Sequence, residues 1–377
     1  MRILMITPYY YPYCSGISEY VKRLSEQLVK KGHSVTVLTS RHDKNLNKKE
    51  KIKNVNVIRS RVLFRLNKGV FMPSFVLKAW SLSPGYDIVN IHLPMIESGL
   101  ISLFIKKKKL FSTYHCDLKL ERTITGRFLE RIYYLSAGTA LKKSRNIITY
   151  TRDYAVHSRL LKYFLKKIKI TYPPINENDF SYKKKNLRKT YSIKKQEKVI
   201  GFSGRFVYEK GLPYLLRSIP YVLKKYPGAR FILAGEYKEV AGGSTINELK
   251  PLIGKYKKNI ILTGRIDYKD LPDFYSACDV LVLPSIDPLE AFGIVQIESM
   301  YCSTPIIATD LYGVRIPIKR TGMGIIIRQR DEKEIATAIL KVLKNKKKYV
   351  KDRKDIIKEF SIRKTVDFYE KLFRISR

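Results

Sequence analysis

Short apolar runs alternate with longer segments of helical spacing along this chain, and the alternation occurs twice. In the first half, the runs typical of β-strands are Ile3–Ile6, Val35–Leu38, Val55–Ile58, Ile88–Ile91, Leu110–Tyr114 and Ile147–Tyr150. In the second half they are Val199–Ser203, Phe231–Ala234, Ile260–Thr263, Val280–Leu283 and Ile306–Ala308. Because alternating strands and helices build parallel sheets covered by helices, we predict two Rossmann-like α/β domains.

The length and the break in this pattern place the domain boundaries. A chain of 377 residues exceeds the usual size of a single core. The periodicity breaks near Thr171–Asn176, and a polar, lysine-rich stretch follows. We predict an N-terminal domain at 1–175, an interdomain connection at 176–198, a C-terminal domain at 199–350, and a helical segment at 351–377 that packs back towards the N-terminal domain.

The chain is strongly basic, with a formal net charge of +41. Residues 1–180 hold 33 Lys and Arg against 12 Asp and Glu, so both halves share the excess. A specific nucleic-acid binder usually concentrates its charge on a recognisable module, so we expect no specific nucleic-acid partner. A cationic surface suits phosphorylated ligands or an anionic membrane, and a solvated lysine-rich surface is an equal alternative.

Cysteine usage and hydropathy bear on the compartment. The four cysteines are scattered and form no C-x-x-C pair, which favours a reducing cytosol over a disulfide frame or a zinc site: Cys14, Cys116, Cys278 and Cys302. No apolar run approaches the ~18–20 residues of a membrane span. The N-terminal Met1–Pro8 predicts a first strand and not a signal peptide. We therefore expect a cytoplasmic protein.

Two carboxylates eight residues apart, Glu290 and Glu298, follow the apolar run 279–285, with Phe292-Gly293 between them. A strand that leads through a loop into a helix puts the helix N-terminus at the carboxyl edge of a parallel sheet, where α/β folds bind ligands. The free N–H groups of a first helical turn bind anions. The segment therefore predicts a ligand site around a helix that begins near Gly293.

A second candidate site is the turn GFSGRFVYEKG, which follows the first strand of the second domain. Gly204 and Gly211 permit a tight backbone around Arg205 and Lys210. A guanidinium fork and an ammonium point charge before a helix suit a diphosphate. A surface turn with ordinary charges is the alternative, and the Glu pair in the same domain favours the functional interpretation.

The two candidate sites together resemble the motifs of retaining GT-B glycosyltransferases of family 4, the "glycosyl transferases group 1" class. The turn carries G-R-x4-K-G, and the segment with the Glu pair carries E-x-F-G-x4-E some 80 residues later. Lys31–Leu38, with its G-H-x-V-T-V pattern, and Tyr275–Ser285 are similar to further segments of that family. The resemblance covers nearly the whole chain. It implies a GT-B architecture, in which two Rossmann-like domains face across a cleft and C-terminal helices close the chain.

The resemblance implies roles for individual residues. Arg205 and Lys210 would hold the diphosphate of a nucleoside-diphosphate-sugar, beside Gly204, and Glu298 would bind the ribose hydroxyls. The donor sugar would face Glu290 and the backbone of Phe292, Gly293 and Ile294. No D-x-D motif occurs, so we expect no metal and no cofactor, with two side-chain cations in place of a divalent ion.

Two residues of the first domain complete the predicted site. Gly16 heads the first helix and would lie against the diphosphate or an acceptor phosphate. His115 ends an apolar run and would contact the donor sugar and its phosphate, which places it with Glu290, Arg205 and Lys210 as a catalytic residue. The alternative is a structural histidine, and His92 serves as an internal comparison because it also ends a strand.

The function implied is retaining transfer of a sugar to an acceptor hydroxyl, on a glycan or lipid-linked glycan at the cytoplasmic membrane face. The basic segments Phe104–Leu110 and Tyr154–Lys169, the second expected as a helix, are candidate contacts with anionic lipid. Alternatives are a GT-B phosphorylase or sugar-phosphate synthase, and a non-catalytic nucleotide-sugar-binding subunit. Residues 312–316 depart from the family's G-G-x-P-E, so the donor sugar is not assigned.

Overall fold

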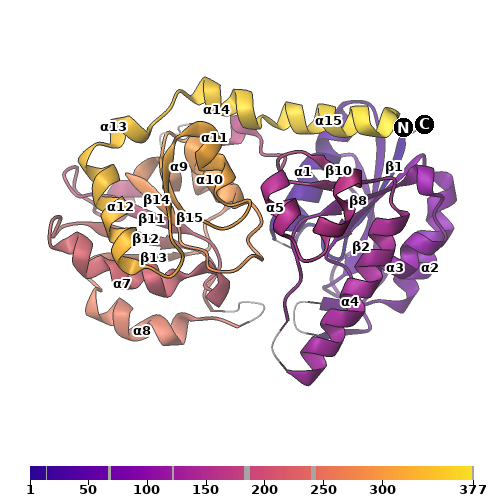
Figure 1. Ribbon diagram of the computed structural model, residues 1–377, viewed down its shortest axis with the longest axis horizontal. Coiled ribbons are helices and arrows are strands. Elements are labelled where there is room, and N and C mark those ends of the chain that lie inside the picture. The colour runs from indigo at the N-terminus through magenta and orange to yellow at the C-terminus, as the bar shows by residue number, and fades with distance from the viewer. Residues whose placement is uncertain (14, 67–68, 121–122, 182–186, 239–242, 376–377) are drawn as a thin grey trace. The chain divides into compact units, whose positions relative to one another are not determined.

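The computed structural model describes residues 1–13, 15–66, 69–120, 123–181, 187–238 and 243–375 (Figure 1). The chain forms two compact units. Unit 1 contains Met1–Pro174 and Ile362–Arg377, and unit 2 contains Ile175–Ser361. Cys14, one of the four cysteines considered above, lies outside the described residues.

Unit 1 is built on an eight-stranded sheet in the order β10-β9-β8-β7-β1-β2-β4-β3, in which only β3 pairs antiparallel. The strands are β1 (Arg2–Ile6), β2 (Ser34–Arg41), β3 (Lys49–Ile52), β4 (Val55–Arg61), β7 (Ile88–Leu93), β8 (Leu110–Tyr114), β9 (Asn146–Thr149) and β10 (Ile168–Ile170). A separate antiparallel pair consists of β5 (Phe64–Leu66) and β6 (Gly69–Phe71).

The helices of unit 1 connect these strands as the alternation predicts. They are α1 (Gly16–Lys30), α2 (Pro73–Leu82), α3 (Ser98–Leu103), α4 (Ile124–Lys143), α5 (Arg152–His157) and α15 (Ile362–Arg374), with 3-10 turns η1 (Ser83–Gly85), η2 (Lys107–Lys109) and η3 (Leu161–Lys167). The single helix expected over Tyr154–Lys169 is wrong. The chain leaves the helix at Ser158, whose hydroxyl donates to Asp117, and later pairs with β9 as the short strand β10.

Unit 2 has a six-stranded, wholly parallel sheet in the order β13-β12-β11-β14-β15-β16. Its strands are β11 (Val199–Ser203), β12 (Arg230–Ala234), β13 (Ile260–Gly264), β14 (Val280–Leu283), β15 (Ile306–Thr309) and β16 (Gly324–Ile327). Its helices and turns are η4 (Glu177–Phe180), α6 (Leu187–Thr190), η5 (Tyr208–Lys210), α7 (Leu212–Leu223), α8 (Ile246–Lys255), η6 (Tyr268–Asp270), α9 (Leu271–Ala277), α10 (Ile294–Tyr301), α11 (Ile316–Thr321), α12 (Glu332–Lys344), α13 (Lys346–Tyr349) and α14 (Arg353–Phe360).

The core of unit 2 lies between one face of this sheet and the helices α7 and α12. Their inward side chains repeat at helical spacing and are buried together with Phe202 and Phe231 of the sheet: Leu215, Leu216, Ile219, Ile335, Ile339 and Val342. Burying side chains of this size stabilises the fold by about 1.5–3 kcal/mol each. The core therefore fixes the strand ends from which the site loops emerge.

The predicted connection at 176–198 is not a free linker in the structure, because its described residues pack within unit 2. Phe180 is fully buried, and its ring centroid lies 5.4 Å from that of Tyr268 and 6.1 Å from that of Tyr275. Arg188 donates to the Asp279 carboxylate over 2.9 Å. Although this stretch is polar and lysine-rich, the Phe180 side chain and the Arg188–Asp279 ion pair fix it to unit 2.

The predicted C-terminal segment at 351–377 divides at Ser361, with α14 in unit 2 and α15 in unit 1. Helix α15, yellow in Figure 1, packs on α1. Its Tyr369 hydroxyl lies 2.9 Å from both the Tyr20 hydroxyl and Thr113 Oγ1, and its Glu370 accepts from Lys31 Nζ over 2.8 Å. Among the helices that the structure describes, none combines the length and the apolar character needed to cross a lipid bilayer.

Each sheet has a point where the strand order reverses. In unit 2 the chain adds β12 and β13 on one side of β11 and then returns to place β14 on the other side. In unit 1 it adds β2 and β4 on one side of β1 and returns to place β7 on the other. Loops that leave neighbouring strands in opposite directions open a crevice at the carboxyl ends, which is where α/β sheets bind ligands.

Candidate active site

The two sequence motifs of unit 2 meet at its switch point. One is the loop after β11, and the other is the loop after β14, the parallel neighbour of β11. Gly211 has a φ of +65°, and a Cβ built on it would lie 1.9 Å from the carbonyl oxygen of Pro284. The amide of Ile286 donates to the carbonyl of Glu209 over 3.0 Å. The glycine therefore allows the two loops to pack backbone against backbone.

This packing brings Lys210 and Glu290 together as a partly buried ion pair, in which the ammonium donates to Glu290 Oε2. The Ser285 hydroxyl lies 3.5 Å from the same carboxylate oxygen. The residues predicted for the diphosphate and for the donor sugar are thus direct neighbours. Opposite charges in contact at a sheet edge form a dipolar site that can bind both an anion and a hydroxyl.

Arg205 lies in the same loop as Lys210 but is more exposed. Its guanidinium lies 4.0 Å from the Glu209 carboxylate, and 44% of its side chain is accessible. The loop turns at Gly204, whose carbonyl oxygen would lie 1.9 Å from a Cβ built on Gly235, just after β12. Gly235, at a φ of +149°, is therefore required for this turn, although no local pattern in the sequence indicates it.

We expect Gly235→Ala to lower the free energy of unfolding by roughly 1–3 kcal/mol, because the new methyl group overlaps a backbone oxygen. The matched control is Gly254→Ala in α8, where a Cβ meets no atom within 4 Å. Urea unfolding of both variants measures the difference. Equal unfolding midpoints for the two would contradict the predicted clash.

Glu298 occupies the interior of α10 and is buried. Its carboxylate accepts a hydrogen bond of 2.8 Å from the hydroxyl of Tyr275 on α9. Burial, and then the Glu298 charge, raise the pKa of Tyr275 well above its usual value, so this phenol remains a donor. Tyr275 is thus a positioning residue for Glu298. The sequence indicates that the segment Tyr275–Ser285 resembles the family, but it does not indicate a role for the tyrosine.

The backbone around Gly293 is fixed by packing. Gly293 caps α10 with a φ of +76°, and a Cβ there would lie 2.5 Å from Leu283 Cδ2. The Phe292 side chain is buried, with its ring 6.3 Å from that of Phe360, so only its backbone remains for the proposed contact with a sugar. Ile294 begins the helix as expected from the sequence.

The loop that departs from the family pattern is tied to this backbone. Gln296 Nε2 donates to the carbonyls of Phe292 and Val314, both over 2.8 Å. Arg315 pairs with Asp310 over 3.0 Å and lies over the Tyr312 ring, 4.9 Å from its centroid. Substitutions in this loop can therefore move the backbone that is assigned to the donor sugar.

His115, in unit 1, is buried in a chain of polar side chains at the end of β8. Its Nδ1 contacts the Tyr150 hydroxyl, and its Nε2 lies 3.0 Å from His92 Nδ1. His92 Nε2 lies 3.3 Å from the amide nitrogen of Asn90, and the ring of Tyr20 packs edge-on at 4.8 Å from His115. The predicted catalytic histidine and its comparison residue therefore form one network.

Both histidines are held neutral. Burial lowers the pKa of His92 to about 3, and burial together with His92 lowers the pKa of His115 well below its usual range. An imidazole that is neutral at pH 7 carries no charge to neutralise a diphosphate. Both ring nitrogens of His115 have a partner within unit 1, so a contact with the donor would replace one of these two interactions.

These two pKa values predict a stability effect. The unfolded chain protonates a histidine near pH 6.5 and the folded one does not, so stability present above pH 6.5 is lost as pH falls towards about 3. Glu97, whose pKa burial raises to about 7, acts in the opposite direction in this window. We therefore compare His92→Gln with the wild type, because the Glu97 contribution cancels in the difference.

The stability of His92→Gln relative to the wild type should rise by about 1.5 kcal/mol between pH 6.5 and pH 5. Each pH unit corresponds to about 1.36 kcal/mol per proton, and the unfolded histidine goes from half to almost full protonation over this range. Urea unfolding at the two pH values measures it. A pH-independent difference would mean that His92 titrates normally in the folded protein.

Gly16 is the first residue of α1. The preceding Ser15 caps this helix through a reciprocal pair of hydrogen bonds with Ser18. A Cβ built on Gly16 meets no atom within 4 Å, so packing within the described residues does not require a glycine at this position. Such open space leaves room for the approach of a ligand.

Comparison with known families agrees with this geometry. Residues 183–360 match the family model for glycosyl transferases group 1, and residues 14–179 match the model for glycosyltransferase family 4. The chain belongs to this glycosyltransferase family. The two models meet near the boundary between the units, so the family assignment covers both sheets and both halves of the predicted site.

Relatives extend the match over the full chain. The glycosyltransferase is 27% identical to an uncharacterised glycosyltransferase of Methanocaldococcus jannaschii over 98% of both chains. It is 26% identical to the alpha-monoglucosyldiacylglycerol synthase of Streptococcus pneumoniae, over 82% of this chain and 71% of that one. Its structure resembles that of the Anabaena protein HepE, solved with UDP-glucose, at a TM-score of 0.76 and 17% identity over 99% of both chains. The predicted GT-B fold is confirmed.

Proposed function

We propose that this glycosyltransferase moves a sugar from a nucleoside-diphosphate-sugar to an acceptor hydroxyl, with retention of anomeric configuration and without a metal ion. The observation that carries the proposal is the contact between Lys210 and Glu290, which come from loops 80 residues apart at the switch point of unit 2. The UDP-glucose held by the Anabaena protein supports a donor of this class.

The chemistry needs the charges that these loops supply. Breaking a sugar–phosphate bond leaves a nucleoside diphosphate anion and an oxocarbenium-like sugar. Lys210 and Arg205 would stabilise the anion as it forms, and preorganised charges of this kind are often the largest catalytic contribution. When the diphosphate shares the Lys210 ammonium, the Glu290 carboxylate becomes available to the sugar hydroxyls, and Glu298 binds the ribose diol through charge-assisted hydrogen bonds.

Retention follows from a same-face reaction. We assign neither Glu290 nor Glu298 as a nucleophile or a general base. The leaving phosphate would instead take the proton from the acceptor hydroxyl as the new bond forms on the face that the diphosphate leaves. Unit 1 would contribute Gly16 near a phosphate and His115 as a neutral hydrogen-bonding group.

The acceptor would be a glycan or a lipid-linked glycan at the cytoplasmic face of the membrane. The name of the pneumococcal relative, a glycolipid synthase, supports this choice. The excess of basic residues supports a peripheral contact with anionic lipid.

A thermal-shift screen of nucleoside diphosphates and their sugars tests the donor class, because a ligand at 100 times its Kd stabilises the folded state by about 2.7 kcal/mol. With the best donor, release of the nucleoside diphosphate in excess EDTA tests metal independence, and NMR of the product reads the anomeric configuration. Inversion or a strict metal requirement would contradict the mechanism. A sugar phosphate formed from inorganic phosphate would identify a phosphorylase instead.

A further inference from the structure

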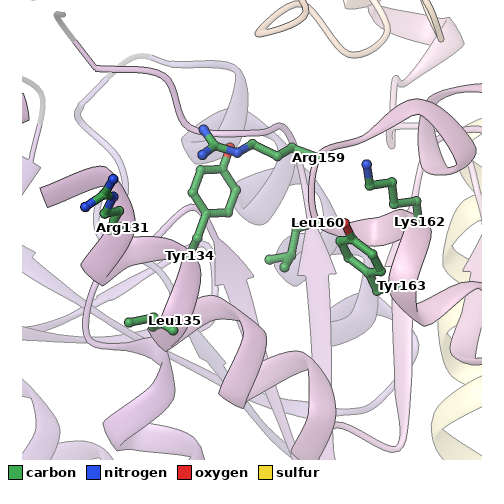
Figure 2. A pocket seen from close by; sticks show the side chains of 7 residues that line it. All are labelled: Arg131, Tyr134, Leu135, Arg159, Leu160, Lys162 and Tyr163. Carbon is green, nitrogen blue, oxygen red and sulfur yellow. The ribbon is translucent and has the colours of Figure 1, made fainter. Parts of the chain in front are cut away.

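Unit 1 carries a shallow pocket of about 590 Å³ that belongs to neither sequence motif (Figure 2). Its lining includes three cations, two tyrosines and an exposed leucine: Arg131, Arg159, Lys162, Tyr134, Tyr163 and Leu135. Figure 2 shows the Arg159 guanidinium next to the Tyr134 ring, 4.4 Å from its centroid. The Lys162 ammonium lies 5.1 Å from the centroid of Tyr163. Cations held beside apolar surface suit an anion that carries an apolar chain.

The pocket is built on a fixed backbone. The Asp117 carboxylate accepts from the amide of Arg159 over 2.9 Å and from the hydroxyls of Ser158 and Tyr114 over 2.7 Å. Arg159 also pairs with Glu130, so Arg131 and Lys162 provide the positive charge beyond this pair. The pocket side chains are thus presented from a wall anchored to the loop after β8.

One wall of the pocket is α4, whose outward stripe is apolar and basic. At 100° per residue, positions 124, 128, 131, 135 and 142 fall within a narrow sector of the helix. Ile124 is 88% exposed, Phe128 is 63% exposed and Leu135 is 74% exposed. The other two positions of the stripe are Arg131 and Lys142, and none of these five positions is acidic.

The composition of this stripe selects among possible partners. Exposed apolar side chains mark protein or membrane contacts, and single-sign charge beside them favours a surface of the opposite sign. Exposed apolar side chains with Lys or Arg beside them favour the interface of an anionic bilayer, where the apolar groups leave water and the cations meet lipid phosphates. Anionic phospholipids supply both a phosphate for the pocket and acyl chains for the stripe.

We propose that the outward stripe of α4 and the adjoining pocket dock unit 1 on an anionic phospholipid bilayer, with lipid phosphates beside Arg131 and Lys162 and with Phe128 and Leu135 in the acyl boundary. This places the membrane contact mainly on α4, outside the basic segments Phe104–Leu110 and Tyr154–Lys169 that the sequence indicates. The surface deepens the lipid-acceptor part of the proposed function, but its binding does not depend on the donor chemistry.

The test is co-sedimentation of the full-length protein with vesicles of phosphatidylcholine alone or mixed with phosphatidylglycerol. The wild type should sediment with the mixed vesicles and should not bind the vesicles of phosphatidylcholine alone. Arg131→Gln with Lys162→Gln should weaken binding to mixed vesicles roughly 25-fold, since each cation at an anionic surface contributes about fivefold. Phe128→Ser with Leu135→Ser should weaken it on the order of 100-fold, because two apolar side chains leave the lipid.

Matched controls separate this surface from exposure or charge in general. Leu77→Ser on α2 removes a leucine that is as exposed as Phe128 (63%), and Lys224→Gln with Lys225→Gln removes two exposed cations of unit 2. Both controls should bind as the wild type does. The proposal is overturned if the wild type ignores anionic vesicles, or if the controls lose as much binding as the test variants. It is also overturned if the α4 variants bind vesicles as the wild type does and lose only the binding of a protein partner.

Thermal-shift binding of nucleoside diphosphates is measured on the same samples. Unchanged nucleotide affinity in the α4 variants shows that unit 2 is intact. If the bilayer proposal fails, the donor assignment still stands. If the wild type does not bind nucleoside diphosphates, the donor assignment is wrong, and the vesicle result is unaffected.

Discussion

Replacing Lys210 by alanine is expected to lower kcat/KM for sugar transfer by about 10²–10³-fold, the usual effect of removing one preorganised group that stabilises charge in a transition state. The ammonium is placed by the close packing of two loops and contacts Glu290. Without it the leaving diphosphate loses its better-buried cation, because Arg205 is more exposed. Steady-state kinetics with the donor found by the thermal-shift screen measure the change.

Two further variants sharpen this prediction. Lys210→Arg keeps the charge but changes its shape, so it should recover part of the activity lost in Lys210→Ala. Lys224→Ala removes an exposed cation elsewhere in unit 2 and should leave kcat/KM unchanged. If Lys210→Ala retains full turnover and full affinity for the nucleoside diphosphate, the assignment of this loop to the diphosphate is wrong.

Replacing Glu298 by glutamine is expected to weaken binding of the nucleoside diphosphate by about 10- to 100-fold, because hydrogen bonds to a charged group contribute about 1.5–3 kcal/mol. The substitution preserves size, and the amide oxygen can still accept from the Tyr275 hydroxyl. The fold should therefore remain, and the lost affinity reports on the carboxylate charge. Isothermal titration or thermal shift measures it.

Pyrophosphate provides the control for the ribose assignment, because it carries the diphosphate without a ribose. Its affinity should be the same for Glu298→Gln and the wild type. Tyr275→Phe should weaken nucleoside diphosphate binding less, since it removes only the group that orients Glu298. Equal nucleotide affinity in Glu298→Gln and the wild type would remove the ribose role.

The sequence predicts much of the fold, because its strongest patterns are local. The strands Leu110–Tyr114 and Val280–Leu283 have the bounds expected from their apolar runs. The edge strand Lys49–Ile52 escapes prediction because its residues K-E-K-I are mostly polar, and only antiparallel pairing with β4 makes it a strand. Gly324–Ile327 is a short apolar run without alternation, and its place beside β15 defines it.

The candidate site is predictable in its residues but not in its contacts. Spacing and resemblance indicate Lys210 and Glu290 separately, whereas their pairing depends on strand order in the sheet. Gly235 is required by the position of a backbone oxygen from another loop, which no local pattern encodes. The engagement of His115 with His92 likewise arises because β7 and β8 are neighbours.

The return of α15 to unit 1 makes that unit discontinuous in the chain. The ribosome synthesises all of unit 2 before it releases the helix that supplies Tyr369 to β8 and Glu370 to Lys31 at the end of α1. Unit 2 can therefore complete its core during translation. In the nascent unit 1, the surface of α1 that packs against α15 remains uncovered until α15 has been synthesised. Truncation before Ile362 should damage the distant N-terminal unit more than the adjacent one.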